Sequence, residues 1–342
     1  MKSFFQNLLL ACLSLIVTLT VLEGGFRFIS QYSKKPPQWS SRPSFYFAPE
    51  HTKTFQDYAY QTPKPENTFR IAVIGDSYTF APYMQFTDTF PKILERMLRL
   101  NTPDDRQQLQ RIEVINYGVP AYSTSHEVRS AVRALKDGAD LIILQITLND
   151  AEIKPYRPTG LNTTNDRFAA PTLTGFWSVL THSKLAGFLL TRWHNAQTVK
   201  AYTNYFINLF EHPRKWKIFS KSVLKIRALC KKHNVKLVAT VFPLFGLALD
   251  QHYPFKGITE KILTFLKDKD IPALDLFPAY LNIPLEILQV IPSVDRHPNE
   301  IAHRIAAEQI YLWLEKNSLI PETFLIKRRF PTRINKNFDS NT

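Results

Sequence analysis

The chain has 342 residues, of which 44% are hydrophobic and 13% aromatic. This composition is typical of a folded protein and excludes an intrinsically disordered one. The formal net charge of +14 favours acidic partners such as anionic lipid headgroups or acidic polysaccharide, and with no nucleic-acid-binding motif in the sequence we expect no nucleic-acid partner.

The cysteine and metal-ligand patterns argue against two further classes, disulfide-rich proteins and metalloproteins. The chain has only Cys12 and Cys230, and Cys12 lies in an apolar N-terminal segment, so no disulfide framework is expected. No CxxC, HExxH or other spaced ligand cluster indicates a metal site, and no cofactor is expected.

The N-terminal segment predicts a membrane anchor. Ser3 to Leu22 include no charged side chain, and these 20 residues span about 30 Å as a helix, which is enough to cross a bilayer core. A cleaved signal peptide is the alternative, but the sequence VLEGGFRF has no A-x-A cleavage pattern. We therefore expect a single-pass anchor over residues 1–25 that contacts the membrane through residues 4–22.

The charges that flank this anchor bear on its orientation. Lys2 precedes the apolar segment, whereas Arg27, Lys34 and Lys35 follow it. The positive-inside rule therefore favours a cytoplasmic location for the rest of the chain.

Strand-like and helical patterns alternate after an irregular linker, rich in Pro, Ser and aromatic residues, over residues 26–68. Continuous apolar runs predict strands at 71–75, 112–116, 141–147, 235–242 and 271–277. Helical spacing marks 89–100, 125–137, 217–233, 257–268 and about 299–316. The alternation predicts an α/β domain over residues 69–318, with about five parallel strands covered by helices on both faces.

Two segments depart from this alternation. Residues 151–216 are rich in aromatic residues, with helical patches around 176–190 and 197–210, and are predicted to be an insertion at the rim of the site. Residues 319–342 form a basic tail. The positive charge is concentrated in Arg214–Lys236 and Lys327–Lys336, and a solvated helical face explains the first cluster as well as a binding patch does.

Polar residues lie where three of the predicted strands end. Ser77 follows the first strand in the sequence GDS, Gly118 follows the second in NYGVP, and Asn149 follows the third in TLND. Asp295 and His297 precede the last helix in SVDRHPN. Because the carboxyl ends of parallel strands share one edge of the sheet, these residues are expected to converge on one crevice.

The residue types suit nucleophilic catalysis. A serine hydroxyl such as that of Ser77 is a weak nucleophile unless a base removes its proton, and His297 can act as that base while Asp295 orients its ring. The backbone amides of Ser77 and Gly118 and the side-chain amide of Asn149 are candidate donors to an oxyanion.

Each of these segments also has an ordinary structural explanation. Asp76-Ser77 can cap a helix, Gly118-Val119-Pro120 can form a bend, Asn149-Asp150 a turn, and His297-Pro298-Asn299 a turn and cap. Their occurrence together at the ends of predicted strands favours catalysis. Packing or surface roles are expected for His126, His194, His212, His233 and His303.

These segments resemble the SGNH (GDSL-type) hydrolase family, in particular its membrane-anchored bacterial subgroup. The resemblance covers about residues 69–318 and rests on GDSYTF with Ser77, NYGVPAYST with Gly118, LND with Asn149 and DRHPN with Asp295 and His297. Thr147 stands where the family often has glycine, and one residue rather than two separates Asp295 from His297. The second difference is common in the membrane-anchored subgroup.

The resemblance implies a three-layer α/β/α, flavodoxin-like SGNH hydrolase fold, with the catalytic domain in the periplasm or otherwise outside the cytoplasm. It implies hydrolysis of carboxylic esters, such as O-acetyl or acyl groups on a glycan or lipid, through an acyl-enzyme and without a metal. An O-acyltransferase acting on a cell-envelope polysaccharide and a catalytically silent glycan-binding scaffold are the alternatives. The oligomeric state is left open.

Overall fold

The structure is a computed structural model that describes residues 2–32, 57–100, 111–153, 178, 182–292 and 295–325. Two compact units divide the chain: Met1–Arg42 with Lys154–Glu211, and Pro43–Ile153 with His212–Thr342. Residues 33–56, most of the predicted insertion before residue 182, Ser293-Val294 and the basic tail from residue 326 lie outside the described residues.

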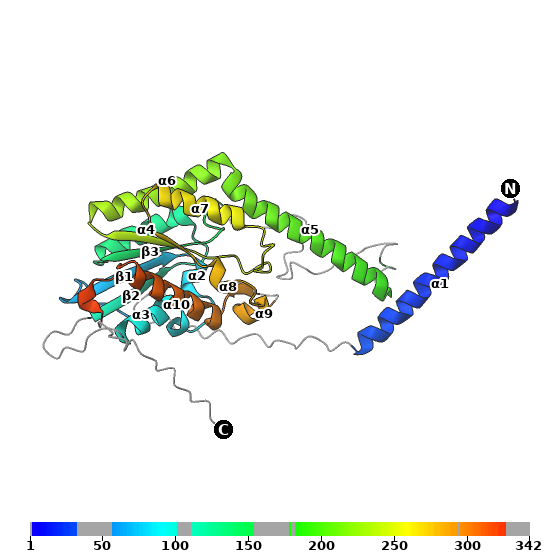
Figure 1. Cartoon of the computed structure of the whole chain (residues 1–342), viewed down its shortest axis with the longest axis horizontal. Helices are drawn as coiled ribbons and strands as arrows, with labels where there is room; N and C mark the ends of the chain where they lie inside the picture. The colour runs from blue at the N-terminus through cyan, green and yellow to red at the C-terminus, as the bar shows by residue number, and fades with distance from the viewer. Residues whose placement is uncertain are drawn as a thin grey trace, which may run out of the picture. The chain divides into compact units, whose positions relative to one another are not determined.

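A five-stranded parallel sheet forms the centre of the second unit. Its strands, β1 (Thr68–Gly75), β2 (Arg111–Gly118), β3 (Leu141–Ile146), β4 (Lys236–Val241) and β5 (Ala273–Asp275), are arranged in the order β2-β1-β3-β4-β5 (Figure 1). All eight residues of β1 are buried, which explains the continuous apolar run from Ile71 to Gly75. The expected flavodoxin-like order is confirmed.

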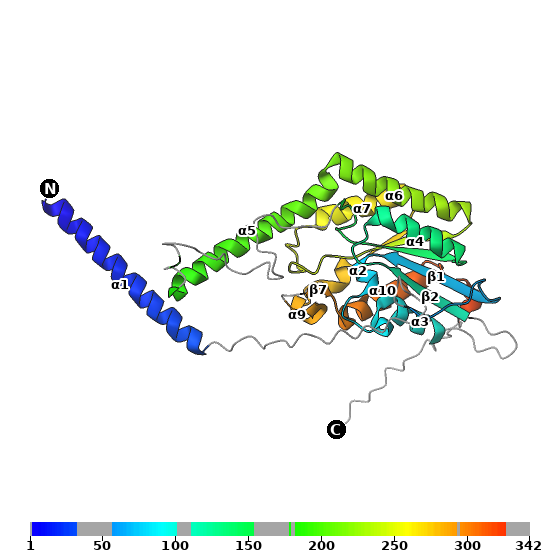
Figure 2. The same cartoon turned by 180° about the vertical axis from the view of Figure 1, so that it is seen from behind.

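Helices cover both faces of the sheet, as Figures 1 and 2 show. One layer contains α4 (Thr124–Lys136), α6 (Pro213–Lys232) and α7 (Lys256–Asp268), and the other contains α3 (Phe90–Leu100) and α10 (Glu300–Lys316). Helix α6 buries Phe219, Val223, Ile226 and Cys230, which are spaced to lie on one face. The basic residues of this helix alternate with that buried set, so the charge cluster lies on its solvated side.

Several short elements were not predicted from periodicity. They are α2 (Ser77–Phe80), η1 (Phe86–Asp88), α8 (Phe277–Tyr280), α9 (Leu285–Leu288), β6 (Gln289–Ile291), β7 (Asp295–Pro298) and η3 (Glu322–Phe324). Strands β6 and β7 pair in an antiparallel arrangement, so Asp295 and His297 lie on a short strand directly before α10. Elements of three or four residues carry too few positions to display a repeat.

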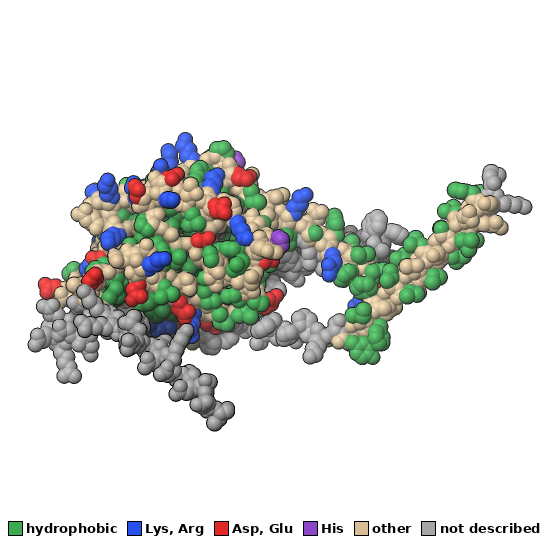
Figure 3. Space-filling view, in the orientation of Figure 1, with side chains coloured by type: hydrophobic (Ala, Val, Ile, Leu, Met, Phe, Trp, Pro, Cys, Tyr) green, Lys and Arg blue, Asp and Glu red, His purple; other side chains and the backbone are tan. Residues whose placement is uncertain are grey.

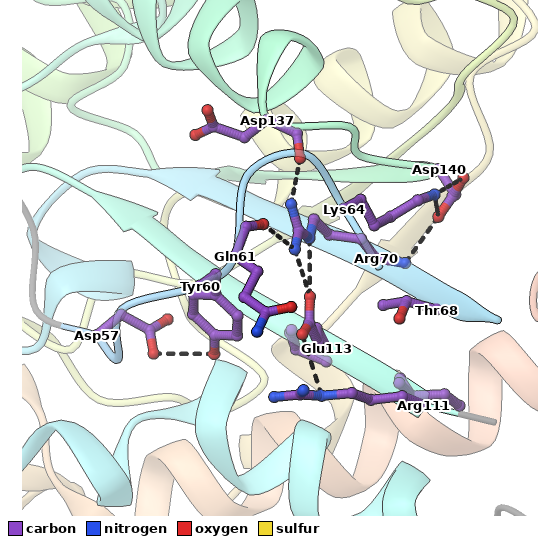
Figure 4. Close-up of polar contacts among 12 residues, drawn as sticks. Asp57, Tyr60, Gln61, Lys64, Thr68, Arg70, Arg111, Glu113, Asp137 and Asp140 are labelled. Atoms are coloured by element: carbon purple, nitrogen blue, oxygen red, sulfur yellow. Dashed lines mark hydrogen bonds and ion pairs between the residues drawn. The ribbon is translucent and has the colours of Figure 1, made fainter. Parts of the chain in front are cut away.

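A network of buried and partly buried charged residues holds the segment before β1 against the start of the sheet (Figure 4). Arg70 is fully buried and pairs with Glu113 on β2, with 2.7 Å between Arg70 Nη2 and Glu113 Oε2. The same Nη2 donates to the carbonyl of Gln61 at 3.0 Å. Lys64 Nζ lies 2.6 Å from Asp140 Oδ1. This network is at the amino end of β1, far along the strand from Ser77.

The first unit contains two long helices, α1 (Lys2–Tyr32) and α5 (Lys184–Glu211). Ser3–Ile29 of α1 has a mean hydropathy of 2.1 and is long and apolar enough to cross a membrane, judged by length and composition. Figure 3 shows hydrophobic side chains along α1. Helix α5 replaces the two helical patches that the sequence predicted around 176–190 and 197–210.

Candidate active site

Ser77 lies at a sharp junction between β1 and α2. Strand β1 ends at Gly75, and the side chain of Asp76 then caps α2 by accepting the N–H of Tyr78 at 2.9 Å. Ser77 is the first residue of the helix. The capping role therefore belongs to Asp76, while the Ser77 hydroxyl is directed to another partner.

That partner is His297, 220 positions further along the chain. His297 Nε2 lies 3.0 Å from Ser77 Oγ, and His297 Nδ1 lies 2.6 Å from Asp295 Oδ1. An ionised carboxylate can only accept a hydrogen bond, so Asp295 keeps the ring proton on Nδ1 and leaves the Nε2 lone pair facing the serine hydroxyl. This is the arrangement in which a histidine can remove the serine proton.

The short spacing between Asp295 and His297 is compatible with this contact. Asp295 Oδ1 also accepts the backbone N–H of His297 at 2.9 Å, which closes a local turn around Arg296. The two side chains remain partly accessible, with exposed fractions of 32% for His297 and 18% for Asp295. A substrate can therefore reach the hydrogen-bonded chain from solvent.

The three candidate oxyanion donors lie at the same edge of the sheet but differ in their present partners. The N–H of Ser77, at the first position of α2, is one of the groups that have no partner inside the helix. Asn149 Nδ2 donates to Asp76 Oδ2 at 2.6 Å, and a primary amide keeps a second N–H for a substrate. The N–H of Gly118 donates to Asn116 Oδ1 at 2.9 Å, so its role as an oxyanion donor, which stays a prediction, requires that bond to be shared or exchanged.

Glycine at position 118 has a packing reason that the sequence did not reveal. A Cβ at Gly118 would lie 2.3 Å from the Phe80 backbone nitrogen and 2.7 Å from the Thr79 carbonyl carbon. Only glycine lets β2 approach α2 this closely. The position of the helix that carries Ser77 thus depends on the absence of a side chain at 118.

Buried carboxyl groups support the loop that carries Asn149. The Thr147 hydroxyl lies 3.2 Å from Asp76 Oδ2 and is hydrogen-bonded to Asn149 Oδ1, while Asp150 Oδ2 accepts the Thr147 N–H at 2.7 Å. Asp76 is fully buried, and this burial raises the pKa of its carboxyl. This loop is therefore restrained by hydrogen bonds to two buried acidic side chains, Asp76 and Asp150.

Glu127 on α4 is a buried neighbour of Asp150 that sequence reasoning missed. Burial raises the pKa of both carboxyls well above the usual range, and the negative charge of Asp76 adds to the effect. Both oxygens of Glu127 and Oδ1 of Asp150 lack a hydrogen-bond donor among the described residues. The only signal in the sequence was an acidic residue on the apolar side of a predicted helix.

His303 lies near the site without joining it. It is fully buried on α10, and its Nδ1 accepts the backbone N–H of Phe90 at 3.0 Å. Burial lowers the pKa of His303 to about 3, so the ring is neutral at ordinary pH. This agrees with the expected packing role, and the His126 ring likewise completes the N-terminal cap of α4.

Among the described residues, no group of three or more His, Cys, Asp or Glu side chains is arranged to hold a metal ion. Cys12 and Cys230 are both free, the first exposed and the second buried.

Comparison with known proteins yields structural likenesses only. No protein-family model and no curated protein match the chain. The chain is similar to the psychrotrophic esterase EstA from Pseudoalteromonas sp. (14% identity, TM-score 0.42, covering 73% of this chain and 99% of that chain). It is also similar to a lipolytic protein of the G-D-S-L family from Veillonella parvula DSM 2008 (14%, TM-score 0.39, 72% and 99%) and to an acetylxylan esterase from Geobacillus stearothermophilus (12%, TM-score 0.39, 72% and 93%). These identities and TM-scores carry no conclusion about activity, which therefore depends on the geometry of the site.

Proposed function

We propose that the chain is a membrane-anchored serine esterase of the SGNH (GDSL) type. The observation that carries this proposal is the hydrogen-bonded chain from Asp295 through His297 to Ser77 at the carboxyl edge of a parallel sheet. A nucleophile, a base and an orienting carboxylate in this order are the parts that acyl transfer to serine requires.

The first half of the reaction forms an acyl-enzyme. Ser77 Oγ attacks the ester carbonyl carbon while His297 Nε2 takes the hydroxyl proton, and Asp295 stabilises the resulting imidazolium. The carbonyl oxygen becomes an oxyanion near the N–H groups of Ser77, Gly118 and Asn149, where each lost donor typically costs about 3–4 kcal/mol. Collapse of the intermediate breaks the bond to the alcohol, which leaves with the proton from His297.

The second half repeats these steps with water. His297 removes a proton from water, the hydroxide oxygen attacks the acyl carbon, and Ser77 leaves as the hydroxyl with the proton returned by His297. The net products are a carboxylic acid and an alcohol. No step requires a metal or an organic cofactor.

The substrate is proposed to be an acyl ester on a glycan or lipid near the membrane. Helix α1 would keep the site within reach of the cell envelope, and the net charge of +14 suits an acidic polymer or lipid surface. We further propose that the catalytic domain lies outside the cytoplasm, because the resemblance of its sequence blocks implies export and outweighs the small charge difference across the anchor, which favours the opposite orientation.

Labelling of the full chain in detergent micelles by a fluorophosphonate probe tests this proposal. The wild type should be labelled and should hydrolyse short acyl esters, while Ser77→Ala and His297→Ala should lose both properties. Ser222→Ala, which removes a hydroxyl bonded to the Ile218 carbonyl on α6, and His252→Ala, at an exposed position, are matched controls that should react normally. A folded wild-type protein that is neither labelled nor active would refute the esterase and favour the silent scaffold.

A further inference from the structure

The end of the candidate membrane span is hydrogen-bonded to the start of α5. Glu23 is the first charged residue after the uncharged segment of α1. Its carboxylate accepts the N–H of Lys184 at 2.9 Å, the N–H of Leu185 at 2.9 Å and the hydroxyl of Ser183 at 2.8 Å. The first N–H groups of a helix have no partner inside it, so Glu23 caps α5 from a different helix.

Three more contacts strengthen this junction. Arg27, one turn further along α1, donates from Nη2 to the carbonyl of His182 at 2.9 Å and from Nε to Glu23 at 2.8 Å. The rings of Phe26 and Phe188 pack with their centroids 4.9 Å apart. Helix α5 therefore begins beside residues 23–27 of α1.

This junction sets the depth at which α5 begins if α1 crosses a bilayer. The uncharged residues 3–22 fill about 30 Å of hydrocarbon, so Glu23 emerges at the level of the lipid headgroups. The first turn of α5, bonded directly to Glu23, lies at the same level.

The first turns of α5 carry exposed apolar and basic side chains, the types that suit the level of the lipid headgroups. Phe188, Leu189 and Trp193 have exposed fractions of 38%, 56% and 61%, large values for apolar side chains on a folded protein. Leu189 and Trp193, four residues apart, lie on one side of the helix, and Phe188 lies next to that side against Phe26 of α1. Lys184 and Arg192 are exposed within the same ten residues. Tryptophan and basic residues are enriched where a protein meets the membrane interface.

We propose that residues 184–193 of α5 form a second membrane contact, lying in the headgroup region of a bilayer that contains anionic lipid. Phe188, Leu189 and Trp193 enter the boundary with the acyl chains, and Lys184 and Arg192 meet the lipid phosphates. The inference rests on α1 as a membrane span and is independent of the esterase reaction.

Quenching of tryptophan fluorescence by brominated lipid tests this contact. The full chain is placed in vesicles of phosphatidylcholine and phosphatidylglycerol, with and without bromine on the acyl chains, and flotation of the protein with the vesicles is measured first. Trp193→Phe should remove at least one fifth of the bromine-dependent quenching, the share of one of the five tryptophans. The matched control Trp313→Phe, on α10, should leave it unchanged.

A second substitution tests the hydrogen bonds between Glu23 and the start of α5. Glu23→Ala should reduce the quenching as Trp193→Phe does, whereas Glu211→Ala, at the other end of α5, should not. Equal quenching in the wild type and Trp193→Phe would overturn the proposal, as would failure of the full chain to float with vesicles. A tryptophan signal that depends on protein dilution but not on bromine would also overturn it, because a second copy of the chain would then cover this face.

Discussion

The buried carboxyl groups of Glu127 and Asp150 are expected to make the protein less stable as pH rises. One substitution should remove this pH dependence. Glu127 and Asp150 are fully buried, and three of their four oxygens lack a donor among the described residues. A proton kept on the pair would supply a donor between the two groups. Glu127→Gln should replace that proton by an amide N–H, which can point to Asp150 Oδ1 at every pH.

The size of the effect follows from proton linkage. In the unfolded chain the two groups titrate near their ordinary values of 4.5 and 3.8, whereas burial raises both pKa values well above these in the folded chain. Above pH 4.5 the folded state therefore binds more protons, and its free energy of unfolding falls as pH rises toward the folded pKa. One retained proton corresponds to about 1.4 kcal/mol per pH unit, or about 2.7 kcal/mol over two units.

Urea unfolding of the full chain in detergent at pH 5.5, 6.5 and 7.5 measures this slope. Glu127→Gln should flatten the decline, by at most about 1.4 kcal/mol per pH unit for one retained proton, relative to the wild type. The control Glu260→Gln, an exposed carboxyl on α7, should keep the wild-type slope. If Glu127→Gln and the wild type decline in parallel, no proton is retained on the pair and the reasoning fails.

Three other predictions concern the triad, the glycine contact and the buried ion pair. Asp295→Asn should lower ester hydrolysis by about 10⁴-fold because the histidine loses the group that fixes its tautomer, and a fall below tenfold would contradict the assigned role. Gly118→Ala should lower both activity and melting temperature because its Cβ would meet backbone atoms at 2.3 and 2.7 Å, whereas Gly257→Ala, with no atom within 4 Å, should be tolerated; equal effects would contradict the packing argument. Arg70→Met should cost up to about 3–5 kcal/mol in denaturant unfolding because it leaves the buried Glu113 carboxylate with only Arg111, whose side chain is 52% exposed, as a partner, and a loss below about 1 kcal/mol would show that the buried pair is dispensable.

The sheet could be predicted because its physical cause is local in sequence. Strands covered on both faces must be apolar along their whole length, and β1 and β3 accordingly consist almost entirely of buried apolar residues. Once five such runs alternate with helices, parallel topology places the residues that follow each strand at one edge. Ser77 and Asn149 were found by this route.

Long-range polar contacts could not be predicted in the same way. Arg70 interrupts the apolar run of β1, but nothing in the sequence identifies Glu113, 43 positions later, as its partner. Glu23 is similarly bonded to a helix about 160 positions away. The hydrogen bond from the Gly118 N–H to Asn116 is local, but every residue except proline has a backbone N–H, so the sequence does not indicate which acceptor it binds.

The two positions at which the sequence departs from the SGNH pattern that it resembles have a common physical explanation at the site. Thr147, in place of the glycine of that pattern, supplies a hydroxyl that lies within hydrogen-bond distance of Asp76 and of Asn149 and can donate its one proton to either of them. Asp295, one residue closer to His297 than usual, accepts both the backbone N–H and the ring Nδ1 of that residue with the same oxygen. Each departure adds a hydrogen bond that restrains a side chain needed for the proposed reaction. The Thr147 hydroxyl bonds to the side chain of Asn149 in its own loop, and the Asp295 carboxylate bonds to the backbone of His297 two residues later. The variant blocks are thus compatible with the geometry that the esterase mechanism requires.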